Sequence, residues 1–130
     1  MALRRNNDFH RTVKAVEYSS FSHGGTGGSP QTDTDVIVPA TGKRIYVTGW
    51  SITMVGSAAA CSGDLYLTDG DKTSTNQILS ATHVGVTPVV HSINFGEHPV
   101  ALTTDTSLKI SSTEADGHMV AYGTVYYIEV

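Results

Sequence analysis

The chain has 130 residues and a mass of 13.8 kDa, which is enough for one domain with a buried core and too little for two. Charged residues make up 15% of the chain and hydrophobic residues 39%, which excludes a coiled coil and a highly charged disordered protein. The formal net charge of -4 lacks the basic excess typical of nucleic-acid-binding domains, so no nucleic-acid partner is expected.

The cysteine count and the hydropathy pattern exclude further classes. Cys61 is the only cysteine, so the chain has neither an intramolecular disulfide nor a multi-cysteine metal site. Residues 1–10 read MALRRNNDFH, where a signal peptide would need an apolar run after the arginines. No segment approaches the roughly 18 apolar residues of a membrane-spanning helix. We therefore expect a protein that stays where it is made, with no membrane partner.

Residues 1–34 differ in composition from the rest of the chain. Residues 1–17 carry a net charge of +2, and residues 22–30 form the Gly/Ser-rich run SHGGTGGSP. This composition fits either a disordered tail or an extended arm with a flexible linker. We interpret it as an arm that docks on a partner, through the basic and aromatic residues Arg4, Arg5, Phe9, Arg11 and Lys14.

From residue 35 to residue 130 the pattern changes to short alternating segments separated by Gly, Pro, Asp and Asn, which is typical of β-strands. The segments are residues 36–40, 43–55, 64–68, 77–81, 89–95, 100–102, 107–111 and 119–130. None shows helical periodicity. The pattern predicts an all-β fold, an eight-stranded antiparallel β-sandwich of jelly-roll type, with a fibronectin-like sandwich as the alternative.

The two longest segments predict which residues share a face. In residues 43–55 strict alternation places Ile45, Val47, Gly49, Ser51, Thr53 and Val55 on one side, and Tyr46, Thr48, Trp50, Ile52 and Met54 on the other. In residues 119–130 it places Val120, Tyr122, Thr124, Tyr126, Ile128 and Val130 together. Aromatic residues at alternate strand positions are typical of a core or a subunit interface. We expect an oligomer interface that includes Trp50, His91, Tyr122 and Tyr126; a sugar-stacking platform is the alternative.

No motif predicts catalysis, a cofactor or a metal. The six histidines lack the spacings that bring two imidazoles together on one strand or helix. Asp69-Gly-Asp71 lacks the twelve-residue spacing and closing glutamate of a calcium-binding loop, so we interpret it as a hairpin turn. Gly25–Gly28 has no preceding apolar strand, as a phosphate-binding loop would need, and Gly49-Trp50-Ser51 lacks the second glycine of a nucleophile elbow. We predict no catalytic, cofactor-binding or metal-binding residue.

Several segments resemble small β-sandwich virion proteins of phages, the head-decoration and fibre-type capsid accessory proteins. They are residues 45–52 (IYVTGWSI), 64–70 (DLYLTDG), 93–102 (INFGEHPVAL), 106–110 (TSLKI) and 123–127 (GTVYY). The resemblance covers about two thirds of the chain. It implies a non-enzymatic virion protein, commonly a homotrimer seated on the major capsid protein at the capsid surface. The N-terminal segment matches nothing in that group.

These observations support three hypotheses from different classes. The first is a phage structural protein whose sandwich forms a trimer and whose arm docks on the major capsid protein. The second is a carbohydrate- or receptor-binding module of a fibre or tail tip, with exposed aromatic side chains. The third is a small hydrolase, which would need a cleft that joins His, Asp and Ser.

Overall fold

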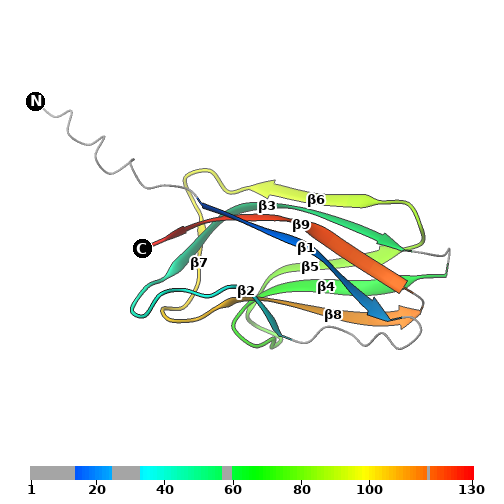
Figure 1. Ribbon diagram of the computed structural model, residues 1–130, viewed down its shortest axis with the longest axis horizontal. Helices are drawn as coiled ribbons and strands as arrows, with labels where there is room; N and C mark the ends of the chain where they lie inside the picture. Colours follow the sequence, from blue (N-terminus) through cyan, green and yellow to red (C-terminus); the bar gives the residue numbers. More distant parts are fainter. Residues whose placement is uncertain (1–13, 25–32, 57–59, 117) are drawn as a thin grey trace, which may run out of the picture.

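The computed structural model describes residues 14–24, 33–56, 60–116 and 118–130, and these form strands and turns only (Figure 1). The strands are β1 (Lys14–Gly24), β2 (Thr34–Ile37), β3 (Ile45–Gly56), β4 (Ser62–Asp69), β5 (Gln77–Val84), β6 (Val89–Asn94), β7 (Val100–Ala101), β8 (Leu108–Asp116) and β9 (His118–Glu129). No helix in the described part of the chain is long and apolar enough to cross a membrane.

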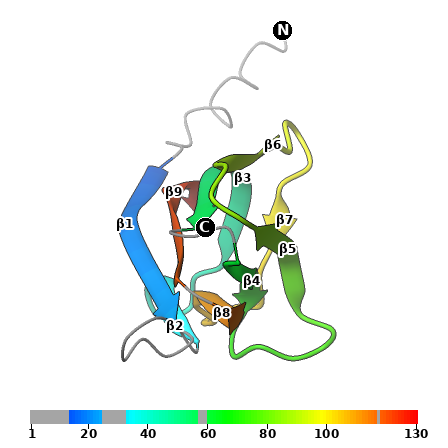
Figure 2. The same cartoon turned by 90° about the vertical axis from the view of Figure 1, so that its right-hand side faces the viewer.

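The strands form two antiparallel sheets that face each other (Figures 1 and 2). The first sheet has the order β1-β9-β3-β6, and β7 also pairs with β3; the second has the order β2-β8-β4-β5. Strands β6 and β7 pair with successive stretches of β3, Gly49 to Met54 and then Tyr46 to Val47, as one interrupted strand would. The chain crosses between the sheets at most connections, which is the double Greek-key arrangement of a jelly roll. The predicted fold class is confirmed.

All eight predicted strands have a counterpart, but β1 lies inside the segment that composition predicts to be an arm. It pairs with β9 from Lys14 opposite Tyr127 to Gly24 opposite His118, with an irregularity between Tyr18 and Phe21. The sandwich therefore begins before residue 35, where composition alone places its start. Residues 1–13 and 25–32 lie outside the described residues, so the interpretation of those parts as arm and linker stays a prediction.

The core lies between the sheets and is built from alternate residues of the long strands. Its fully buried side chains include Ile45, Ile52, Met54, Leu65, Leu67, Leu102, Leu108, Met119 and Val125. Described strands of both sheets contribute side chains to this core. Each sheet therefore has one face turned to the core and one turned outward. The outward faces differ in chemistry, and that difference leads to the candidate site.

The predicted faces of β3 are wrong beyond Val47. The pairing of β3 with β9 shifts between Val47 and Gly49, which is a β-bulge that inserts one extra residue, Thr48. Ile45 and Val47 consequently share the inner face with Trp50, Ile52 and Met54, all of them buried. Because side chains alternate with period two, a single inserted residue exchanges the faces of every residue that follows.

Candidate interaction surface

On β9, β3 and β6 the outward residues of the first sheet are uncharged, and the edge strand β1 has Glu17 in register with Thr124. On β9, Tyr122 and Tyr126 alternate with the buried Ala121 and Val125, and each tyrosine is 42% exposed. The outward residues of these strands are Val120, Tyr122, Thr124, Tyr126 and Ile128, Ser51, Thr53 and Val55, and Val90, Ser92 and Asn94. Interface centres are typically depleted of charge and rich in tyrosine. The face has that composition.

The turn from β5 to β6, at one end of the sandwich, is strongly apolar. Val84, Val86, Val89 and Val90 lie within seven residues of chain, and their side chains are between 41% and 67% exposed. We call these four residues the valine patch. Val90, opposite Thr53, lies on the outer face of the first sheet, whereas Val84 belongs to β5 of the second sheet and Val89 lies opposite the buried Met54. Tyr122 lies close by on the outer face, since it and Val90 are both paired with Thr53. Clusters of exposed apolar side chains on a small domain mark contact sites.

The valine patch is not among the site residues predicted from the sequence, although the sequence carries a signal for it. Residues 73–96 contain no Asp, Glu, Lys or Arg, and the patch lies near the end of that stretch. An uncharged run of valines is equally typical of strands that bury their side chains. The sequence does not distinguish these two possibilities. The structure shows that the four valines lie at the turn between β5 and β6 and are exposed to solvent.

Among the predicted interface residues, Trp50 is corrected to a core position. Its side chain is 5% exposed and packs edge to face against Phe95, with ring centroids 5.3 Å apart and planes at 75°. The bulge at Thr48 is the reason, because it turns Trp50 to the inner side of the sheet. Trp50 therefore stabilises the sandwich itself.

His91 lies on β6 opposite Ile52, on the side of the strand that faces inward, and is half-buried. Its Nε2 atom is buried and has no hydrogen-bond partner within the described residues. His91 thus borders the valine patch without lying on the outer face. Tyr122 and Tyr126 do lie on that face, about 13 Å apart along β9, as four residues of strand imply.

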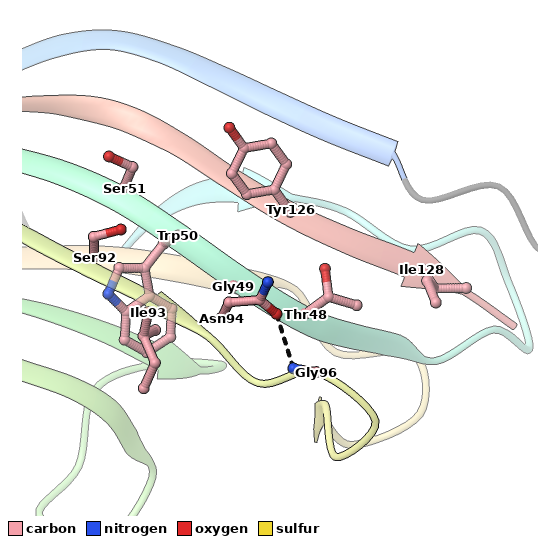
Figure 3. A pocket seen from close by; sticks show the side chains of 10 residues that line it. All are labelled: Thr48, Gly49, Trp50, Ser51, Ser92, Ile93, Asn94, Gly96, Tyr126 and Ile128. Atoms are coloured by element: carbon pink, nitrogen blue, oxygen red, sulfur yellow. Dashed lines mark hydrogen bonds between the residues drawn. The ribbon is translucent and has the colours of Figure 1, made fainter.

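A hollow of about 550 Å³ lies at the other end of the outer face, beside Tyr126 (Figure 3). The hollow lies next to the bulge, at a position where Gly49 has no side chain to fill the space. A Cβ atom at Gly49 would lie only 2.4 Å from the carbonyl oxygen of Ile93, so glycine is required for β6 to approach β3 this closely. Ser51, Ser92 and Asn94 line the hollow with polar groups.

The outer face of the second sheet is polar, and its groups are paired within the chain. Asp64 accepts hydrogen bonds from the hydroxyls of Thr82 (2.6 Å), Thr113 (3.0 Å) and Tyr66 (3.3 Å). These donors, the Thr82 hydroxyl first, lower the pKa of Asp64 below its usual value. The Nζ atom of Lys72 lies 4.0 Å from the centre of the Tyr66 ring. The carboxylate of Asp64 on this face is thus satisfied by hydrogen bonds within the chain.

Carboxylates in the turns beside that face also bind groups of the same chain. Asp69 accepts hydrogen bonds from Thr103, at 3.0 Å from its backbone nitrogen and 2.7 Å from its hydroxyl. Asp71 pairs with Lys109 at 2.7 Å, and this contact raises the pKa of the lysine. Within the described ranges no three His, Cys, Asp or Glu residues come together in a way that could hold a metal ion.

Most of the predicted docking residues lie outside the described part of the chain. These are Arg4, Arg5, Phe9 and Arg11. Lys14 is the first residue of β1, in register with Tyr127 of β9.

Comparisons with known proteins give a limited result. No protein-family model matches the chain, and no curated protein matches it. A solved structure of the infectious bursal disease virus Gt strain is similar, with 16% identity over 92% of this chain and 33% of that chain, and a TM-score of 0.37. The VP2 subviral particle of the same virus gives 15% identity, 92% and 32% coverage, and a TM-score of 0.35. The chain spans about a third of the length of these chains, and similarity at this level carries no argument about function.

Proposed function

We propose that this chain is a non-enzymatic structural protein of a phage virion, one that decorates or stabilises the capsid. In this proposal it is made in the host cytoplasm and resides on the capsid surface. It self-associates through the valine patch, as a homotrimer, and docks on the major capsid protein through residues near its N-terminus. The basic residues Arg4, Arg5 and Arg11, together with Phe9, make that second contact.

The observation that carries the proposal is the valine patch. Four exposed valines around the turn from β5 to β6, of which Val90 lies in the same row as Tyr122, leave apolar surface in water that a second copy would cover. Burying the exposed part of each valine contributes about 1 kcal/mol to association. Closed symmetric oligomers are the usual arrangement in which identical chains cover such a surface.

The fold and the sequence resemblance agree with this role. Jelly-roll sandwiches occur in viral capsid domains and in lectins, so the fold admits a virion protein without requiring one. The resemblance to small phage virion proteins rests on segments that include parts of β3, β4, β6, β7, β8 and β9, which are strands of the jelly roll. The outward residues of β9, β3 and β6 are uncharged, whereas Asp64 of the second sheet is paired within the chain, and this contrast supports the first sheet as the side that meets a partner.

The test is the mass of the protein in solution by sedimentation equilibrium, for the full chain and for Val90→Asp. We expect a trimer for the full chain and a monomer for Val90→Asp, because a carboxylate in the patch cannot be buried without a partner. Val38→Asp is the matched control, since Val38 is 65% exposed but lies outside the patch, and it should remain a trimer. A monomeric full chain that also fails to assemble on capsids would refute the proposal.

A further inference from the structure

The hollow beside Tyr126 is uncharged, and its lining is mainly apolar with a few polar groups. Its lining combines the ring of Tyr126 with the hydroxyls of Ser51 and Ser92 and the amide of Asn94. No Asp, Glu, Lys, Arg or His is among the residues that line it. Its volume of about 550 Å³ lies within the range of roughly 300–1,000 Å³ typical of small-molecule sites. A charged ligand would find no counter-charge there, so the lining favours a neutral one.

The amide of Asn94 is held in a defined orientation. The backbone nitrogen of Gly96 donates a hydrogen bond to Oδ1 of Asn94 at 2.8 Å (Figure 3). That contact identifies the oxygen of the amide and leaves the NH₂ group on the side away from Gly96. The NH₂ group has no hydrogen-bond partner among the described residues, and it can donate to a ligand in the hollow.

The hydroxyls of the lining are also available. Ser51 and Ser92 lie directly opposite each other on β3 and β6, so both side chains point to the outer face. Neither hydroxyl, nor that of Tyr126, has a hydrogen-bond partner in the described part of the chain. The hollow therefore presents the hydroxyls of Ser51 and Ser92 and the oriented amide of Asn94 beside the exposed ring of Tyr126, and Thr48 also lines it.

We propose that this hollow binds a neutral saccharide. A sugar ring combines many hydroxyl groups at its edge with an apolar face of C–H groups, which matches polar groups arranged beside an aromatic ring. Tyr126 stacks on the apolar face of the sugar, while Asn94, Ser51 and Ser92 exchange hydrogen bonds with its hydroxyls. The site is separate from the valine patch, which lies at the turn from β5 to β6, so the inference does not depend on the proposed trimer.

The experiment uses the full chain, labelled with ¹⁵N, and follows the side-chain amide of Asn94 and the backbone amide of Gly96 by NMR. Glucose, galactose, N-acetylglucosamine and lactose are titrated separately to roughly 50 mM, because a shallow site is expected to have a Kd of about 1 mM or weaker. We expect at least one sugar to shift both signals in a saturable way.

Three variants decide whether the binding occurs in the hollow. Tyr126→Ala should weaken it about tenfold or more, and Asn94→Asp several-fold, since aspartate keeps the oxygen for Gly96 and lacks the NH₂ donor. Tyr122→Ala is the control, because Tyr122 is an equally exposed tyrosine on the same strand and face, and it should bind like the full chain.

Two results would overturn the inference: no saturable shift with any of the four sugars, or binding that Tyr126→Ala leaves unchanged. Sedimentation of Tyr126→Ala separates this inference from the proposed function. The variant should keep the mass of the full chain, whichever way the sugar titrations turn out.

Discussion

Gly123 of β9 lies where a side chain would collide with the backbone of β3. A Cβ atom there would lie 2.1 Å from the carbonyl oxygen of Ser51 and 2.8 Å from the Cα of Ile52. Neither is the end of a flexible side chain, so one strand has to move. We expect Gly123→Ala to lower the free energy of unfolding by about 3 kcal/mol, measured by urea denaturation.

Gly42→Ala is the matched control for this substitution. Gly42 has a φ of +78°, and a Cβ atom added there would meet nothing within 4 Å, so alanine incurs only the backbone penalty. We expect a cost of about 1 kcal/mol. An equal or larger loss for Gly42→Ala would contradict the collision between β9 and β3.

Asp64 makes part of the stability depend on pH. The hydroxyls of Thr82, Thr113 and Tyr66 lower the pKa of Asp64 below 3.8, so the folded state prefers the ionised carboxylate. This contribution is present above the ordinary pKa and is lost as the pH falls through the folded value. We expect Asp64→Asn to reduce stability by about 1 kcal/mol near pH 6, and the difference from the parent protein to shrink below pH 4.

Asp35→Asn is the control substitution for Asp64→Asn, because it also removes a carboxylate charge. Asp35 is half exposed and lies 3.6 Å from Lys109, an exposed ion pair that contributes roughly 0.5 kcal/mol or less. Thermal unfolding of both variants across the acid range measures the effect. A difference for Asp64→Asn that stays constant from pH 6 to pH 3 would show that its carboxylate charge is not involved.

Strand β1 is the element whose role differs most from the expectation drawn from composition. It lies along β9 and forms one edge of the first sheet, so its removal would leave the backbone of β9 unpaired on that side. We expect deletion of residues 1–24 to lower the Tm by about 10 °C or more, or to cause aggregation.

Deletion of residues 1–13 is the matched truncation. It removes Arg4, Arg5, Phe9 and Arg11 but leaves β1, so we expect thermal unfolding like that of the full chain. Comparison of the two truncations by circular dichroism separates the strand from the segment that precedes it. Equal stability of the two would show that β1 contributes little to the sandwich.

At the scale of the whole molecule, the proposed contact with a capsid is electrostatic. In the truncation lacking residues 1–13, three of the chain's eight basic residues are absent, and the association with capsids should weaken. We expect binding of the full chain to fall as salt rises, because exposed charges are screened within about 10 Å at 0.1 M salt. Co-sedimentation with capsids across a salt series measures both effects. If the full chain and the truncation bound capsids equally well, the sandwich, and not residues 1–13, would make the contact.

The class of fold and the positions of eight strands could be predicted from the amino-acid sequence. Alternation of apolar and polar residues is a local property, and the turns at Thr41-Gly42 and Asp69-Gly70 are marked by residues that accept positive φ. Both signals can be read without knowing which strands pair. For the candidate site, sequence reasoning placed Tyr122 and Tyr126 on one face of β9, where the structure has them.

Only the tertiary structure decided how those strands share their faces and edges. The inserted residue at Thr48 becomes visible only when β3 is set against β9, and it moves Trp50 into the core. The place of β1 depends on β9, which lies about a hundred residues further along the chain. The hollow depends on Gly49 and Asn94, which meet across two strands. These features were decided by contacts between distant residues, and a pattern read along the chain carries no information about such contacts.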